Sequence, residues 1–257
     1  MAGYTGDEAA ARAALSNESP AVRAAGLGAL ARLDLLKPWE LRAALVDPAA
    51  LVRRRACELA GRPGFAGMGG SSSADAGGAD AGGADAGGAD VGGADVGGAD
   101  VGGADVGDAL TRALSDPDPS VVEAACYALG ELGAADVSGQ GESDLAVEEQ
   151  GAPAGEVLDV RAGEVVGPLA TIATSHPEAV CREAAVAALG ALGHPDGLRA
   201  VLAAMGDKPA LRRRAAVALA AFEAPEAELA LERAAQDRDW QVRQVAEDLL
   251  GRHSERP

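Results

Sequence analysis

The stretch that decides the fold is DPAALVRRRACELA, residues 47–60, in which an Asp-Pro turn precedes an amphipathic segment. Val52, Ala56 and Ala60 follow one another at intervals of four residues, so they lie on one stripe of an α-helix. The small Ala56 in the middle of this stripe lets a neighbouring helix approach closely. Asp near the cap and Pro in the first turn are ordinary signals for the start of a helix.

The same pattern recurs along the chain. An apolar residue precedes an Arg, a small residue follows three positions later, and an apolar residue follows four positions after that. The Arg position falls at residues 23, 53, 122, 182, 212 and 243, which are separated by 30, 69, 60, 30 and 31 residues. The basic period is therefore about 30 residues, and each long interval contains one period plus an insertion.

A shorter amphipathic stretch precedes each turn, for example residues 39–46 before Asp47, so the repeating unit is helix, turn, helix. Such a unit cannot bury its own apolar face and needs stacked neighbours. Aromatic residues make up only 2% of the chain, and the apolar residues are mostly Ala, Leu and Val, which suit close helix packing. We predict an all-α fold, an α-solenoid of about six helical hairpins.

The spacing Asp-Pro-x-x-x-Val-Arg-x-x-Ala-x-x-x-Leu-Gly, as in residues 47–60 and 177–190, resembles the short HEAT-like repeats named after phycobilisome lyases. The resemblance covers about 190 of the 257 residues. Three residues depart from it: Gly26 stands where Ala is usual, Val122 replaces Arg, and Ala60 replaces Leu. The resemblance implies the architecture, but it says little about function, because such repeats occur in many unrelated adaptors.

Two insertions carry most of the net charge of −18. Residues 75–108 hold eight Asp and no Lys or Arg, and residues 136–164 hold eight acids and one Arg, so the rest of the chain is nearly neutral. The first insertion repeats Ala-Asp-(Ala/Val)-Gly-Gly, which favours disorder because of its Gly pairs and small side chains. A pentapeptide β-helix with an underfilled core and a Ca²⁺-binding repeat are the alternatives.

We therefore expect five segments. They are HEAT-like repeats 1–2 over residues 5–66, a Gly/Ala/Asp low-complexity linker over 67–107, repeat 3 over 108–135, an acidic Gly-rich insertion over 136–163, and repeats 4–6 over 164–252. Loop closure costs little even for a long linker. We accordingly expect repeats 2 and 3 to stack directly, in a single continuous solenoid.

A binding surface is expected on the second helix of each repeat. Positions one and five residues after the Arg position point away from the core, toward the concave groove of similar repeats. The candidate binding residues at these positions are Arg54, Glu58, Glu123, Tyr127, Glu183, Arg213, Gln244 and Asp248. Their mixed charges suit a protein or peptide better than a phosphate backbone.

Two Arg triplets, residues 53–55 and 212–214, occupy equivalent positions in repeats 2 and 5. They suggest either contact with nucleic acid or a structural role, in which Arg53 and Arg212 pair with turn acids such as Asp47 and Asp207. The structural role is the one we favour. Trp39 and Trp240 stand at helix starts, where we expect them to serve in packing.

No catalytic constellation is visible, because His176, His194 and His253 lie at a turn, a repeat junction and the tail, without a triad or metal spacing. Cys57, Cys126 and Cys181 are scattered, which indicates neither a disulfide framework nor a zinc site. We therefore expect no enzyme activity, no cofactor and no metal.

The absence of an apolar run of about 20 residues indicates no membrane span. We expect a cytoplasmic, non-enzymatic scaffold that binds a protein partner, and we do not expect nucleic acid as a ligand. The alternatives are a lyase-like accessory protein for a tetrapyrrole or bilin, which the family resemblance implies, and a nucleic-acid binder that uses the Arg triplets.

Overall fold

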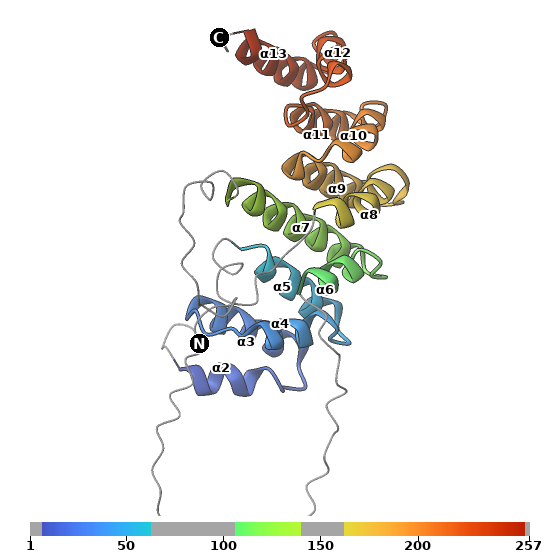
Figure 1. Cartoon of the computed structure of the whole chain (residues 1–257). Helices are drawn as coiled ribbons and strands as arrows, with labels where there is room; N and C mark the ends of the chain where they lie inside the picture. The colour runs from blue at the N-terminus through green and yellow to red at the C-terminus, as the bar shows by residue number, and fades with distance from the viewer. Residues whose placement is uncertain (1–6, 63–105, 140–161, 255–257) are drawn as a thin grey trace, which may run out of the picture.

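The computed structural model describes residues 7–62, 106–139 and 162–254, and in these it contains twelve α-helices and no strand. They form six hairpins that stack in chain order (Figure 1). The hairpins pair α2 (Glu8–Ala14) with α3 (Pro20–Arg32), α4 (Pro38–Leu45) with α5 (Ala50–Ala60), and α6 (Val106–Ala113) with α7 (Pro119–Gly139). The remaining three pair α8 (Ala162–Ser175) with α9 (Ala179–Leu192), α10 (Leu198–Ala204) with α11 (Pro209–Leu219), and α12 (Pro225–Ala234) with α13 (Trp240–Ser254). The predicted α-solenoid is confirmed.

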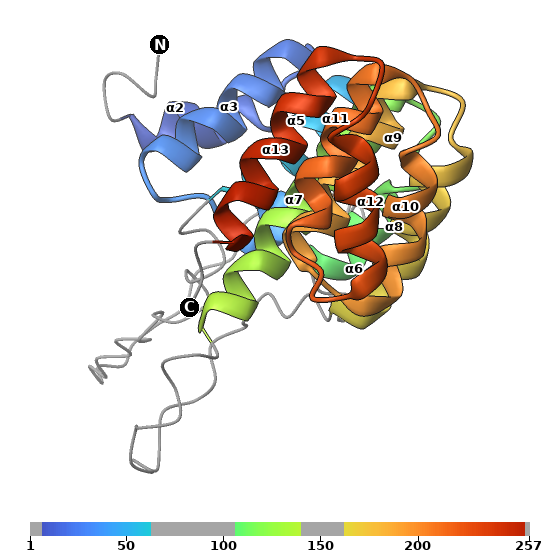
Figure 2. The same ribbon diagram turned by 90° about the horizontal axis from the view of Figure 1, so that it is seen from above.

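The stack has two layers. The second helices of neighbouring hairpins pack on one another from α3 through α5, α7, α9 and α11 to α13. In the view from above, α6, α8, α10 and α12 lie on one side of the stack, and α3, α5, α7 and α13 lie on the other (Figure 2). Because α5 packs directly on α7 and α4 on α6, repeats 2 and 3 belong to one continuous stack, as expected.

The segment boundaries differ slightly from the expected ones. Helix α6 begins at Val106, whose side chain is fully buried, and α7 continues to Gly139. Helix α8 begins at Ala162. Most of the Gly/Ala/Asp linker and most of the acidic insertion lie outside the described residues.

The core is built from the stripe that the repeat pattern predicts. One buried cluster runs from Ala11 in α2 to Leu231 in α12. The small residue of the stripe is fully buried in repeats 2 to 6, as at Ala125 and Ala185. Exceptions occur in the terminal repeats, where Val22 is 39% exposed and Leu250 is partly buried, because an end repeat has a neighbour on one side only.

Glycines bring the second helices into close contact at three consecutive junctions. Each Gly lies eight residues after the Arg position and faces an Ala of the next repeat: Gly61 faces Ala128, Gly130 faces Ala188, and Gly190 faces Ala218. A β-carbon at Gly190 would lie 2.6 Å from the Cβ and 2.7 Å from the Cα of Ala218. The Gly that closes the repeat motif therefore sets the spacing between helices.

A ladder of Arg–Asp pairs joins the turns of successive hairpins. The Nε and Nη2 atoms of Arg53 donate to both carboxylate oxygens of Asp116 at 2.7 and 2.8 Å, and Nη1 donates to the carbonyl of Asp47 at 2.8 Å. Arg212 binds Asp237 in the same way, at 2.8 and 2.7 Å, and donates to the carbonyl of Asp207. Each Arg thus fastens its own turn to the next one.

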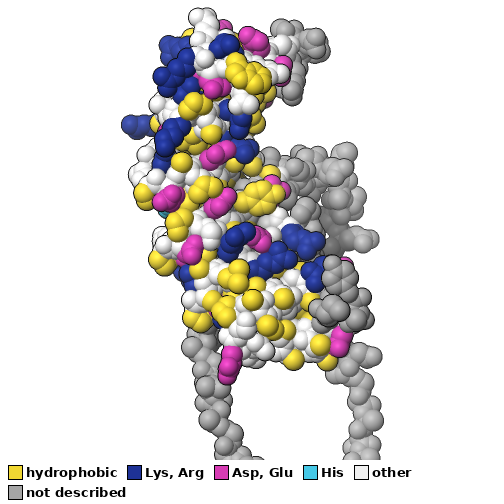
Figure 3. Space-filling view, turned by 180° about the vertical axis from the view of Figure 1, so that it is seen from behind, with side chains coloured by type: hydrophobic (Ala, Val, Ile, Leu, Met, Phe, Trp, Pro, Cys, Tyr) yellow, Lys and Arg dark blue, Asp and Glu magenta, His cyan; other side chains and the backbone are white. Residues whose placement is uncertain are grey.

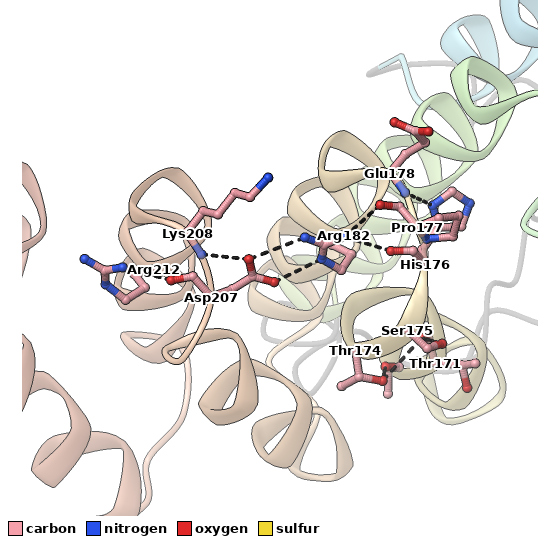
Figure 4. Close-up of polar contacts among 11 residues, drawn as sticks. Thr171, Thr174, Ser175, His176, Pro177, Glu178, Arg182, Asp207, Lys208 and Arg212 are labelled. Carbon is pink, nitrogen blue, oxygen red and sulfur yellow. Dashed lines mark hydrogen bonds and ion pairs between the residues drawn. The ribbon is translucent and has the colours of Figure 1, made fainter.

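The same arrangement holds for Arg23 with Asp47 and for Arg182 with Asp207. Figure 4 shows Arg182 between the carbonyls of its own turn and the carboxylate of Asp207. The structural interpretation of Arg53 and Arg212 is therefore correct, but the carboxylate partner belongs to the following repeat. Sequence alone did not distinguish the two turns, because each turn carries a similar Asp.

The ladder is interrupted once. Val122 occupies the Arg position of repeat 3 and is buried, and His176 occupies the place of the Asp in the turn of repeat 4. The Nδ1 atom of His176 instead accepts a hydrogen bond from the backbone N–H of Glu178 at 3.2 Å. The two substitutions compensate each other, since neither leaves a buried charge without a partner. This junction relies on apolar contact between α7 and α9, including the contact of Gly130 with Ala188.

We expect Gly190→Ala to lower the free energy of unfolding by about 1–2 kcal/mol. Overpacking costs about 1–3 kcal/mol, and the better helix propensity of Ala offsets up to about 1 kcal/mol. Gly167→Ala in α8 is the matched control, because nothing lies within 4 Å of the added carbon, and it should leave stability unchanged or raise it. Urea titration measures both. Equal stability of Gly190→Ala and the parent would contradict the role of the close approach.

We expect Arg212→Met to lower the free energy of unfolding at pH 7 by about 1.5–3 kcal/mol, because Asp237 loses a charged hydrogen-bond donor. The hydrogen bond from Arg212 lowers the pKa of Asp237 below its ordinary value. The stabilisation by this pair is therefore present above the unfolded pKa of about 3.9 and is lost as the pH falls through the folded pKa.

Denaturant titrations between neutral pH and pH 2 should accordingly show a shallower loss of stability on acidification in Arg212→Met than in the parent. The neighbouring Arg213→Met is the control, since Arg213 donates to the neutral Gln241 side chain at 3.0 Å. An unchanged acid dependence in Arg212→Met would show that the ladder does not couple stability to pH.

Candidate functional site

A groove of about 610 Å³ opens on the second-helix layer, between α5, α7 and α9. Its floor is made of small side chains, and its rim carries charged and larger apolar ones. The lining residues are Arg54, Glu58, Ser120, Glu123, Ala124, Tyr127, Gly130, Glu131, Val180, Glu183, Ala184, Ala187, Ala188, Ala191 and Arg214. We call this surface the groove.

A second hollow of about 380 Å³ extends the groove toward the N-terminal end, between α3 and α5. It shares Arg54 and Glu58 with the groove, and Leu51 on its wall is 50% exposed. Within the groove itself, Tyr127 is 58% and Val180 is 43% exposed. Large apolar side chains therefore lie on the surface of three successive second helices.

The structure brings five of the eight candidate binding residues together. The groove is lined by Arg54, Glu58, Glu123, Tyr127 and Glu183. Arg213 lies outside it and donates to the Oε1 atom of Gln241. Gln244 and Asp248 are exposed on α13, at the C-terminal end of the stack.

Sequence reasoning missed several groove residues, among them Glu131, Val180 and Arg214. Val180 lies two residues before the Arg position of its repeat, Arg214 lies two residues after it, and Glu131 lies nine residues after it. The candidates were chosen only at one and five residues after the Arg position. A helix face at least 100° wide includes these flanking rows. The helical periodicity therefore predicts these groove residues, but the row of candidate positions was narrower than the helix face that lines the groove.

Internal ion pairs neutralise most charges of the groove. The Nε atom of Arg54 lies 2.8 Å from Oε1 of Glu58, and the Nε atom of Arg214 lies 3.7 Å from Oε1 of Glu183. Glu123 and Glu131 are different, because neither carboxylate forms an ion pair with any other residue that the structure describes. The groove thus keeps two uncompensated negative charges, one on each side of Tyr127 along α7.

The Arg triplets do not form a free basic surface. Arg53 and Arg212 belong to the ladder, and Arg54 and Arg55 both contact Glu58. In the second triplet, Arg213 and Arg214 contact Gln241 and Glu183. The face shown in Figure 3 accordingly has Lys and Arg side chains interspersed with Asp, Glu and hydrophobic ones. These partners favour the structural role of the triplets.

The two Trp residues are not packing residues. Trp39 is 60% and Trp240 is 61% exposed, so the expectation that they fill the core is wrong. Trp39 is the second residue of α4, and Trp240 is the first residue of α13.

The titratable groups that often carry chemistry have local structural roles here. His194 accepts a hydrogen bond from the backbone N–H of Asp196 at 3.3 Å, as His176 does in its own turn. Burial raises the pKa of the Cys57 and Cys126 thiols to about 12, so both stay protonated at neutral pH. Across the described ranges, no group of three or more His, Cys, Asp and Glu side chains could hold a metal ion.

No helix in the part of the chain that the structure describes combines the length and the apolar character needed to cross a bilayer.

Comparison with known proteins places these hairpins in a family. Residues 166–251 match the model for HEAT repeats, and residues 106–135 match the model for a single HEAT repeat. No curated protein matches the sequence. The finer assignment to the phycobilisome-lyase type of repeat stays a prediction.

Solved structures share the fold at low sequence identity. An engineered protein is 14% identical and has a TM-score of 0.59, with 95% of this chain and 97% of that chain covered. A designed armadillo repeat protein is 13% identical with a TM-score of 0.55, and the match covers 95% and 98%. A second designed armadillo repeat protein, in complex with the peptide (KR)4, is 11% identical with a TM-score of 0.54 and coverages of 96% and 93%.

The family matches cover hairpins three to six, and the stacking, the ladder and the buried stripe extend the same unit through hairpins one and two. The chain is therefore a HEAT-repeat protein.

Proposed function

We propose that this protein is a non-enzymatic scaffold that binds a protein partner in the groove. The observation that carries the proposal is the groove itself, which combines exposed Tyr127 and Val180 with charged side chains over a floor of Ala. Protein interfaces commonly join an aromatic anchor with a polar rim. A groove of about 610 Å³ that is lined by side chains of α5, α7 and α9 suits a segment of polypeptide.

Different side chains hold the stack together and line the groove, and this separation supports the proposal. The ladder residues and the buried stripe hold the stack together, whereas the side chains of Glu123, Tyr127 and Glu131 are exposed. Exposed residues on a rigid scaffold are free to serve binding. One protein of similar fold, a designed armadillo repeat protein, forms a complex with a peptide, which supports peptide binding as a capacity of this architecture.

The two alternative functions have less support. A nucleic acid would need free cations for its phosphates, but the Arg triplets are engaged by Asp116, Asp237, Glu58, Glu183 and Gln241. A bilin carries propionate carboxylates, which the four Glu side chains around the groove do not favour.

The proposal includes a cytoplasmic location. Cys57, Cys126 and Cys181 are buried free thiols, an arrangement that is usual in a reducing compartment.

A steric block tests the proposed function. We expect Ala191→Trp, an exposed position on the groove floor, to remove the proteins that the full chain captures from a lysate of its native cell. Ala203→Trp, an exposed position on α10 outside the groove, is the matched control and should leave capture unchanged. Quantitative mass spectrometry gives the captured proteins, and thermal melting verifies that both variants fold.

Capture that survives Ala191→Trp with a parental melting temperature would contradict binding in the groove. Loss of the same proteins in Ala203→Trp would show that the binding surface lies on the first-helix layer.

A further inference from the structure

Three side chains of α7 form one row along the groove. Glu123, Tyr127 and Glu131 follow one another at intervals of four residues, which places them about 6 Å apart along one face of the helix. All three are exposed, and all three line the groove. The row presents a carboxylate, an aromatic ring and a second carboxylate to any segment that enters.

The surroundings of this row leave its charge uncompensated. The nearest groove cations already have carboxylate partners, since Arg54 contacts Glu58 and Arg214 contacts Glu183. Opposite the row, α9 presents Val180, Ala184 and Ala187, which are apolar. A ligand that complements the groove therefore carries a positive charge that faces the row on α7 and apolar side chains that face α9.

We propose that the groove binds a polypeptide segment that carries a cationic side chain, arginine in preference to lysine, flanked by small or branched apolar residues. This inference rests on the proposed function and adds the chemistry of the partner. The cation lies against the ring of Tyr127 and between the carboxylates of Glu123 and Glu131. The flanking apolar side chains pack on Val180 and on the Ala floor.

Arginine fits this row better than lysine for two reasons. Its planar guanidinium stacks on an aromatic ring and can still donate hydrogen bonds in its own plane to carboxylates on either side. It also loses less hydration than an ammonium group when it enters a partly enclosed surface. An acidic segment would instead place its carboxylates beside those of Glu123 and Glu131, which disfavours binding.

Selection from a random peptide library tests the inference without knowledge of the natural partner. Phage-displayed 12-residue peptides are selected on the full chain, and the most enriched peptide is labelled for fluorescence polarisation. We expect the enriched sequences to contain Arg flanked by apolar residues. The dissociation constant of the labelled peptide should rise about tenfold in the double variant Glu123→Gln/Glu131→Gln, and also as salt increases.

Matched variants separate the charge from the ring. Tyr127→Ala should raise the dissociation constant about fivefold, whereas Tyr127→Phe keeps the aromatic face and should change it less than about twofold. The control for charge is Glu228→Gln/Glu232→Gln, which removes two acids from the exposed surface of α12, outside the groove, and should have no effect. Thermal melting verifies that each variant keeps the parental fold.

The outcomes distinguish this inference from the function on which it rests. Peptides that lose binding to Ala191→Trp, but contain no enriched cation or ignore Glu123→Gln/Glu131→Gln, would overturn the cationic partner and leave the groove as the binding surface. Peptides that bind Ala191→Trp as well as the parent would overturn the groove itself. An Arg-containing consensus that requires both the open groove and the two carboxylates supports both.

Discussion

The solenoid depends on the bidentate pair between an Arg of one repeat and the turn Asp of the next. Each pair, such as Arg53 with Asp116, joins residues far apart in sequence and also satisfies carbonyl groups of its own turn. It therefore sets both the shape of the turn and the position of the following hairpin. The Gly–Ala contacts at the other end of the second helices, such as Gly190 with Ala218, add a second constraint, and the α5–α7 and α9–α11 junctions have both. The groove between α5, α7 and α9 thus lies between a junction with both constraints and the α7–α9 junction, which is held by apolar packing and the contact of Gly130 with Ala188.

Much of this fold could be predicted from the sequence because the stripe and the turn signals are local. Val52, Ala56 and Ala60 indicate a buried helix face without knowledge of the neighbours, and Pro209 and Pro225 mark the first residues of their helices. The partner of each Arg was harder to assign. Asp47 and Asp116 have the same local surroundings, and only the stacking of hairpins determines that Arg53 reaches the second of them.

The groove could be predicted only in part, for a geometrical reason. A fixed offset from the Arg position selects Glu123 and Tyr127 correctly on α7, but on α11 it selects Arg213 although Arg214 lines the groove. Successive repeats are rotated slightly relative to one another, so one row of residues does not face the same surface along the whole stack.

The compensating pair of Val122 and His176 shows that the hairpins are not interchangeable. A hairpin whose second helix carries Arg must be followed by one whose turn carries Asp, and a hairpin with Val at that position accepts a turn without it. A hairpin of the Arg–Asp type therefore offers a guanidinium donor to the hairpin after it and a carboxylate acceptor to the hairpin before it. Donor and acceptor must match at each junction. Duplication of the α4–α5 hairpin in place would preserve the match, because its turn carries Asp47 and its second helix carries Arg53. Exchange of the α8–α9 hairpin with its α10–α11 neighbour would place Asp207 after Val122 and leave that carboxylate without a guanidinium. The order of the hairpins is thus constrained by the match at each junction. A hairpin can be added only if its turn residue matches the hairpin before it and its second helix matches the hairpin after it.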